Sequence, residues 1–159
     1  MAQFEIRDGV AIIPEGTTKI EYGAFLNCTS LESIIIPESV TEVEKYAFSG
    51  CTSLKSITIP KLVTENVPIF LSGCTSLESI VIPKGVKEIK GYAFAGCTSL
   101  TTLTLPIGVN KIEERVFDEC SALATIYVPA KKAGYYKKRL PEQLHDKIVE
   151  LQPEKKTKK

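Results

Sequence analysis

The sequence repeats every 23 residues, and no insertion or deletion interrupts the period. All five cysteines and six of the nine prolines keep this spacing. They are Cys28, Cys51, Cys74, Cys97 and Cys120, and Pro14, Pro37, Pro60, Pro83, Pro106 and Pro129. Self-similarity at a period of roughly 20–30 residues indicates a solenoid, in which each turn contacts only its neighbours. We therefore expect one turn for each period, and we number the full turns one to five after their cysteines.

Three apolar positions precede the proline of each turn. They are Leu31, Ile34 and Ile36; Leu54, Ile57 and Ile59; Leu77, Ile80 and Ile82; Leu100, Leu103 and Leu105; and Leu123, Ile126 and Val128. The last two positions of each set alternate with their neighbours, which is the period of a β-strand. Proline ends the strand because it has no N–H for the ladder. One strand per turn, stacked in register, predicts a parallel sheet.

A second set of apolar residues follows the proline and predicts an opposite wall, on short strands. It consists of Ile20, Val40 and Val43, Val86 and Ile89, and Val109 and Ile112. An Ala-Phe pair comes next in the regular turns, and we expect it on a short 3-10 or helical turn that plugs the interior.

The third turn departs from this pattern on its convex side. Asn66 stands where other turns have Val43 or Ile89, Pro68 follows two residues later, and Leu71 takes the Phe position, with Phe70 one place early. We interpret this as a local rearrangement that turns Val67 inward in place of Asn66. The alternative is a functional site, because departures from local rules cluster at such sites.

The cysteines allow two interpretations. An odd number of cysteines leaves one over in a closed disulfide framework. Neighbouring turns stack about 4.8 Å apart, which is within the reach of a disulfide between them. We favour an interior cysteine ladder of free thiols, because free Cys behaves as a small buried apolar residue.

The pattern predicts a single repeat domain over residues 1–152. Residues 1–16 form an N-terminal cap, 17–129 five repeats, and 130–152 a C-terminal cap that hides the last sheet edge. Residues 1–130 carry a net charge of −5 and residues 131–159 a net charge of +6. We expect residues 153–159 to be a disordered, solvated basic tail. Contact of this tail with nucleic acid or acidic lipid is the alternative.

The unit Ala-Phe-x-x-Cys-Thr-Ser-Leu-x-x-Ile-x-Ile-Pro-x-x-Val-x-x-Ile resembles the BspA-type leucine-rich repeat of bacteria, from about Ile20 to Pro129. The resemblance implies a leucine-rich repeat solenoid of the α/β class, with mostly β structure. Such a solenoid is right-handed, with a parallel sheet on the concave face, short strands and 3-10 turns on the convex side, and caps at both ends. Larger members resemble surface adhesins that bind host matrix proteins or other cells. The resemblance therefore implies an adhesin-like role.

If the three apolar positions of each turn face the core, their neighbours face outward on the concave face. These candidate ligand-binding residues are Ser33, Ile35, Ser56, Thr58, Ser79, Val81, Thr102, Thr104, Thr125 and Tyr127. They are small, hydroxyl-rich and uncharged, which suits a protein or glycoprotein ligand and not nucleic acid, which requires dense Lys and Arg. The alternative is that β-branched residues stand there only because they favour strands.

Residues for catalysis, cofactor binding or metal binding are missing from the pattern. His145 is the only histidine and lies outside the repeats, and no phosphate-binding glycine motif occurs. We therefore expect no enzyme, no cofactor and no metal. No run of about 18 apolar residues occurs, so we expect no membrane insertion.

The sequence thus favours a non-catalytic protein-interaction module that is monomeric, with at most weak self-association. The alternative is a self-associating structural domain of a cell-surface assembly. The first residues are too polar for a signal peptide, which favours the cytoplasm. Secretion or cell-surface display is the alternative if a leader has been removed.

Overall fold

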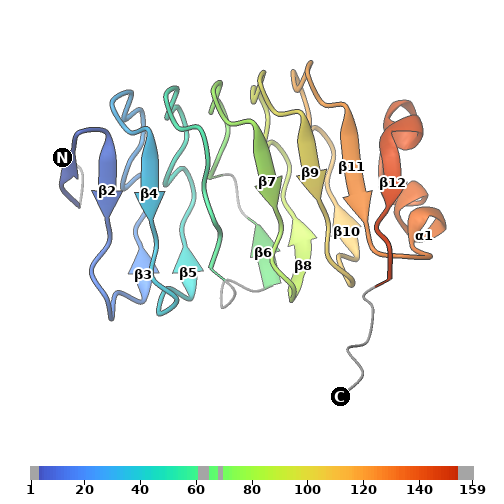
Figure 1. Cartoon of the computed structure of the whole chain (residues 1–159), viewed down its shortest axis with the longest axis horizontal. Helices are drawn as coiled ribbons and strands as arrows, with labels where there is room; N and C mark the ends of the chain where they lie inside the picture. The colour runs from blue at the N-terminus through green and yellow to red at the C-terminus, as the bar shows by residue number, and fades with distance from the viewer. Residues whose placement is uncertain (1–3, 61–64, 68–69, 154–159) are drawn as a thin grey trace.

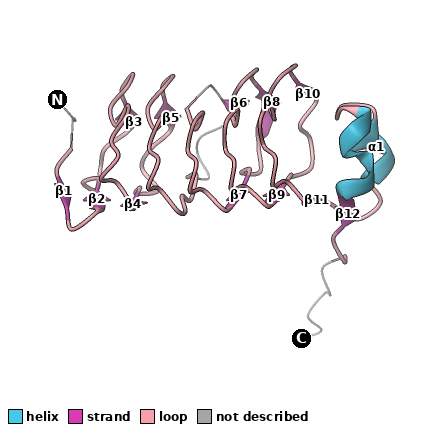
Figure 2. Cartoon of the chain, turned by 90° about the horizontal axis from the view of Figure 1, so that it is seen from above, coloured by secondary structure: helices cyan, strands magenta, loops and turns pink. Residues whose placement is uncertain are grey.

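The computed structural model describes residues 4–60, 65–67 and 70–153. It is an elongated stack of turns with a short helical cap at the C-terminal end (Figure 1). The concave face carries β2 (Val10–Ile12), β4 (Ser33–Ile35), β7 (Ser79–Val81), β9 (Thr102–Thr104), β11 (Thr125–Val128) and β12 (Ile148–Glu150). The opposite wall carries β3 (Lys19–Ile20), β5 (Glu42–Val43), β6 (Glu65–Val67), β8 (Val86–Ile89) and β10 (Lys111–Ile112). Figure 2 shows the two rows as separate walls.

The strands of the repeats pair in parallel and in register with the period of the sequence. Val10 lies opposite Ser33, and Ser79 lies opposite Thr102, which lies opposite Thr125. The solenoid and its parallel sheet are therefore confirmed. The opposite wall is also confirmed as short strands, with Val43, Val86 and Ile89 buried.

Both ends of the concave face are extended by strands from outside the five full turns. At the N-terminus, β1 (Ile6–Arg7) pairs antiparallel with β2, and β2 continues the parallel ladder onto β4. At the C-terminus, the chain passes through α1 (Ala133–Lys137) and the 3-10 helix η1 (Glu142–Lys147) and returns as β12. β12 pairs in parallel with β11, placing Val149 opposite Tyr127.

The core is a stripe of aliphatic side chains and phenylalanine rings between the two walls. Phe25 and Phe48 stack with ring centroids 5.3 Å apart, and Phe94 and Phe117 stack at 6.2 Å. The Ala-Phe segments form hydrogen-bonded turns and not the predicted 3-10 or helical turns. A residue in the left-handed region lies within each, such as Gly23 at φ 62° and Tyr92 at φ 64°, and it stops helix propagation.

The third turn divides both walls. The strand expected at Ser56–Thr58 of the second turn does not form, and the sheet orders end at β4 on one side and at β7 on the other. On the opposite wall, β3 and β5 form one sheet and β6, β8 and β10 another. The opposite wall is thus interrupted between the second and third turns, and the concave face is interrupted on both sides of the unpaired second-turn segment.

The departures of the sequence at the third turn account for this interruption. A register shift between Glu65 and Asn66 places Val67, and not Asn66, opposite Ile89. The side chain of Val67 lies outside the described residues, so its inward orientation stays a prediction. Phe70 and Leu71 are both buried, where the first, second and fourth turns bury an Ala and a Phe. The third turn therefore brings a bulky ring to a position that holds Ala in three other turns and Val116 in the fifth, and a full core responds to added volume by shifting backbone.

The cysteines form a ladder of free thiols. Four thiols each donate a hydrogen bond to a carbonyl oxygen 26 residues earlier in the chain. The Sγ–O distances are 3.1 Å from Cys51 to Phe25, 3.2 Å from Cys74 to Phe48, 3.2 Å from Cys97 to Leu71, and 3.0 Å from Cys120 to Phe94. Each thiol therefore ties its own turn to the preceding one.

Burial should make these thiols unreactive and should make the folded protein less stable as the pH becomes alkaline. Burial raises the pKa of Cys51 and of Cys97 from 9.0 to about 12. Thiols in the unfolded chain ionise at a lower pH than the buried thiols of the folded chain. The stabilisation that Cys51 and Cys97 provide is therefore complete below pH 9 and is lost as the pH rises toward 12. Denaturant melts should show this loss, and replacing Cys51 and Cys97 by Ala should reduce it. Rapid modification of Cys51 or Cys97 by a thiol reagent in the folded protein at pH 8 would contradict the ladder.

Two glycine substitutions should have opposite effects on stability. Gly50 has φ 74°, and a Cβ there would overlap with Oδ1 of Asn27 in the preceding turn. Gly50→Ala should lower the free energy of unfolding by at least about 1–2 kcal/mol, the cost of the left-handed conformation alone. Gly134 lies in α1 with open space around it, so Gly134→Ala should raise stability by up to about 1 kcal/mol. Urea melts of both variants measure the difference, and equal effects would contradict the packing described.

Candidate functional site: the concave face

The ten candidate residues all lie on the outer side of the concave face and alternate with buried residues. Ile35 and Val81 are 58% and 61% exposed. Ser56, Thr58 and Ser79 are exposed, and Ser33, Thr102, Thr104, Thr125 and Tyr127 are half-buried. Eight of these residues lie on β-strands, whereas Ser56 and Thr58 lie in the second-turn segment that pairs with neither neighbour.

The strand register aligns the exposed apolar side chains in one column. Ile12 lies opposite Ile35 at one end, and Val81, Thr104, Tyr127 and Val149 follow one another at the other end. Ile12 is 64% exposed and Val149 is 45% exposed. The column therefore extends into both caps, and Thr58 of the second turn and Thr104 of the fourth turn interrupt its apolar side chains.

The sequence interpretation missed Ile12 and Val149. Ile12 precedes Ile35 by one period, so the repeat alone was sufficient to find it. Val149 carries no such signal, because it lies beyond the last repeat and joins the face only through the pairing of β12 with β11.

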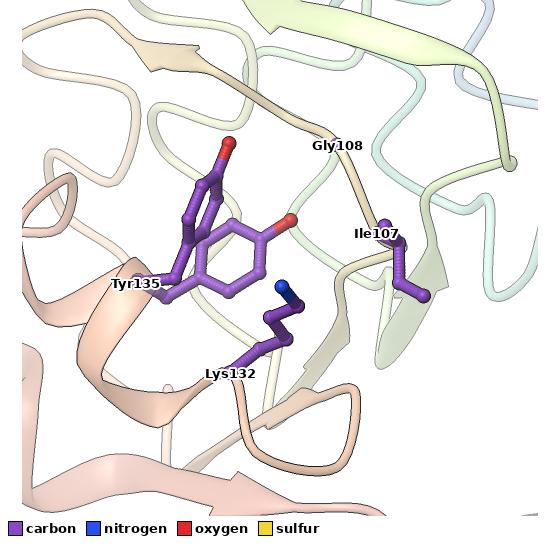
Figure 3. A pocket seen from close by; sticks show the side chains of 5 residues that line it. Ile107, Gly108, Lys132 and Tyr135 are labelled. Carbon is purple, nitrogen blue, oxygen red and sulfur yellow. The ribbon is translucent and has the colours of Figure 1, made fainter.

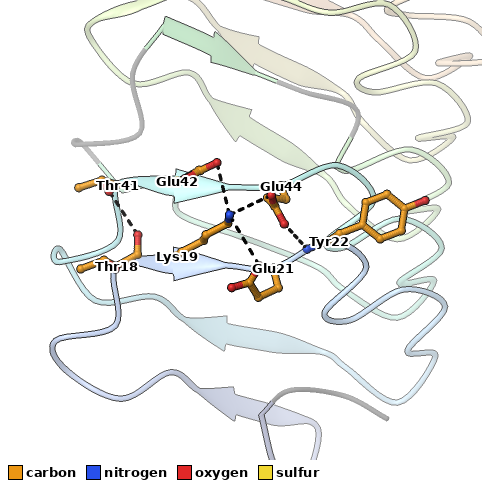
Figure 4. Close-up of polar contacts among 7 residues, drawn as sticks. All are labelled: Thr18, Lys19, Glu21, Tyr22, Thr41, Glu42 and Glu44. Carbon is orange, nitrogen blue, oxygen red and sulfur yellow. Dashed lines mark hydrogen bonds and ion pairs between the residues drawn. The ribbon is translucent and has the colours of Figure 1, made fainter.

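The charged residues gather on the opposite wall, where they join successive turns (Figure 4). Lys19 Nζ lies 3.0 Å from a carboxylate oxygen of Glu44 and 3.9 Å from one of Glu42. Its hydrogen bond with Glu44 raises the pKa of Lys19 and lowers that of Glu44. Glu44 also accepts a hydrogen bond from the Tyr22 N–H at 2.8 Å. The carboxylate thus holds the first turn to the second.

The same arrangement recurs between the fourth and fifth turns. Glu113 accepts a hydrogen bond from the Gly91 N–H at 2.7 Å and lies 3.7 Å from Lys90 Nζ. These carboxylates are already engaged with backbone and lysine, so the wall has a structural role. The ten candidate residues of the concave face, by contrast, are all uncharged.

A small cavity lies where the C-terminal cap meets the last turns (Figure 3). Its volume is about 90 Å³, and its lining includes Ile107, Lys132 and Tyr135. The Tyr135 hydroxyl donates to the Val109 carbonyl at 2.8 Å, and the Arg139 guanidinium lies 3.5 Å from the Tyr135 ring centroid. Small-molecule sites usually measure about 300–1,000 Å³, so this cavity is a packing gap under the cap.

The described residues form no group of three or more His, Cys, Asp or Glu side chains placed to hold a metal ion. The lone histidine, His145, contacts the Leu140 carbonyl at 3.0 Å within the cap. No helix in the described ranges has both the length and the apolar character needed to cross a membrane.

Three solved bacterial structures resemble this fold. A leucine rich cell surface protein from Faecalibacterium prausnitzii is 37% identical, with a TM-score of 0.75, over 80% of this chain and 34% of its own. The Treponema pallidum leucine rich repeat protein is 29% identical, with a TM-score of 0.66, over 75% of this chain and 58% of its own. A leucine-rich repeat protein from Bacteroides ovatus is 25% identical, with a TM-score of 0.62, over 91% of this chain and 42% of its own.

The chain thus spans about a third to three fifths of the length of these proteins. A comparison with curated protein sequences finds no match. The family model of the BspA type leucine rich repeat region matches residues 10–124 in six copies, one more than the five full repeats counted from the spacing. With this match over most of its length, the chain belongs to the BspA-type leucine-rich repeat family.

Proposed function

We propose that this chain is a non-catalytic interaction module that binds a protein or glycoprotein ligand on its concave face, in the manner of an adhesin. The observation that carries the proposal is the apolar column of the exposed Ile12, Ile35, Val81 and Val149 and the half-buried Tyr127, set among uncharged hydroxyl residues. Contiguous exposed apolar surface on a folded protein marks an interaction site more often than isolated apolar residues do.

The dimensions of the face suit a protein partner. Seven ladder positions from Ile12 to Val149, at about 4.8 Å each, span roughly 30 Å. A face of this length accommodates the area of about 800 Å² that each partner buries in a standard interface. Tyr127 near one end and Ile35 near the other offer anchors of the kind that dominate interface energies.

We further propose that the chain acts outside the cell, the second of the two locations that the sequence leaves open. The Faecalibacterium prausnitzii relative, described as a cell surface protein, supports this location. A second candidate function is self-association within a surface assembly. The adjacent exposed side chains of Ile12 and Ile35 favour it, because a second copy can cover them.

Replacing Ile35, Val81 and Tyr127 together by Asp should abolish ligand capture while the fold persists. Three buried charges at an apolar interface should weaken binding at least a hundredfold. A matched control replaces Tyr22, Lys87 and Thr98, which are exposed and lie outside the concave face, by Asp. Capture of purified extracellular matrix glycoproteins by surface plasmon resonance compares the three proteins.

Retained capture by the Ile35, Val81 and Tyr127 variant would contradict the assignment of the face. Light scattering over a range of concentrations tests the alternative function. A mass that rises with concentration, and that the same variant returns to that of a monomer, would favour self-association over ligand binding.

A further inference from the structure

The strand segments of the second and third turns separate and leave a rift between them. The last backbone hydrogen bond between the two segments runs from the Glu78 N–H to the Lys55 carbonyl, at 3.4 Å. In the part of the chain that the structure describes, no backbone hydrogen bond joins residues 56–59 to β7. In the regular turns this is where the parallel ladder runs, and among the described residues it is missing here as well as between residues 56–59 and β4.

The two turns remain stacked elsewhere. On the cysteine side, the Gly50 N–H donates to the Ser72 carbonyl at 2.8 Å, and the Ser76 hydroxyl donates to the Thr52 carbonyl at 2.6 Å. The thiol of Cys74 still bonds to the carbonyl of Phe48. The rift is therefore a wedge, closed at the cysteine side and open toward the prolines.

On the third-turn edge of the rift, ladder groups make no backbone hydrogen bond to the described residues of the second turn beyond Glu78. The Ile82 N–H donates to the Thr104 carbonyl at 2.9 Å, and the Thr102 N–H donates to the Glu78 carbonyl at 3.5 Å. Successive residues of a strand direct their backbone polar groups to opposite sides. Ser79 and Val81 therefore direct theirs toward the second turn, away from β9.

We infer the same alternation for the second turn, because its residues occupy equivalent positions one period earlier. Ile57 and Ile59 correspond to Ile80 and Ile82, so their backbone groups face the third turn. Both edges of the rift thus offer N–H and C=O groups at the spacing of a β-ladder, and backbone groups of this kind form hydrogen bonds with a partner or with water.

A cavity of about 650 Å³ occupies the rift. Its inner lining is apolar, with Ile57, Ile59 and Ile82 at 8%, 6% and 2% exposure, beside Pro83. Glu38 and Lys84 also line the cavity and are exposed. The volume falls within the range of about 300–1,000 Å³ typical of ligand sites.

We propose that this rift binds an extended peptide segment of a partner protein by strand addition. The inserted strand pairs with Ile57 and Ile59 on one edge and with Ser79 and Val81 on the other. Apolar and polar side chains alternate along the inserted strand. The apolar side chains reach Ile57, Ile59 and Ile82, and the polar side chains face solvent. An extended backbone is the occupant that satisfies both edges, and this mode of recognition goes beyond docking on the concave face.

Hydrogen exchange measured by NMR tests the rift directly. In the free protein, the amides of Ile57, Ile59, Ser79 and Val81 should exchange at least a hundredfold faster than those of Ile82 and Leu105, which are bonded to the next turn. A synthetic peptide that copies residues 101–106, with alternating apolar and polar residues, serves as the probe. Saturating peptide should slow the four amides at least tenfold.

A peptide of the same sequence, N-methylated at alternate residues, is the matched control. It keeps every side chain but lacks the N–H groups for one edge, so its affinity should fall at least tenfold. Equal binding of the two peptides would overturn strand addition. The proposal is also overturned if the four amides exchange as slowly as that of Ile82 in the free protein, or if no saturable binding occurs at millimolar peptide.

A proline substitution separates this proposal from binding on the concave face. Val81→Pro removes a rift-facing N–H on an edge strand, where proline is tolerated, so the melting temperature should hold while peptide binding is lost. Thr104→Pro removes an N–H from within the β7–β9–β11 ladder and should lower the melting temperature by several degrees. Replacing Ile35 and Tyr127 by Asp should leave peptide binding intact, whatever it does to capture of matrix glycoproteins.

Discussion

The structure depends on the backbone hydrogen bonds that each turn makes with the next. A turn of 23 residues has too little interior to bury its own apolar side chains, so it folds only when neighbours cover both of its open sides. In the regular turns the exact period keeps donors and acceptors in line with their partners, as between Ser79, Thr102 and Thr125. The cysteine thiols and the carboxylates of Glu44 and Glu113 add polar ties between the same pairs of turns.

The same dependence explains why a local change at the third turn has distant effects. The register shift at Glu65 and Asn66 and the burial of Phe70 lie on the convex side, yet the ladder is also lost on the concave face. A solenoid transmits a displacement in this way because a turn is one continuous loop of chain held between two neighbours. The hydrogen bonds on the cysteine side confine the opening to the proline side.

The two walls divide the tasks of the molecule. Charged side chains that pair with backbone and with each other occupy the wall of β3, β5, β8 and β10, whereas the ten candidate residues of the concave face are uncharged. Polar groups that already have partners gain little from a ligand, and exposed apolar groups gain from being covered. The chemistry available for recognition therefore lies on the concave face and in its rift.

The sequence by itself determined the solenoid, the parallel register, the inward and outward positions of the repeats, and the thiol ladder, because a strict period places equivalent residues in equivalent surroundings. It also indicated the third turn as irregular. The tertiary structure alone decided that the strand at Ser56–Thr58 is lost and that Val149 joins the exposed column. Both outcomes depend on how segments without a periodic counterpart pack against the repeats, and periodicity carries no information about such contacts.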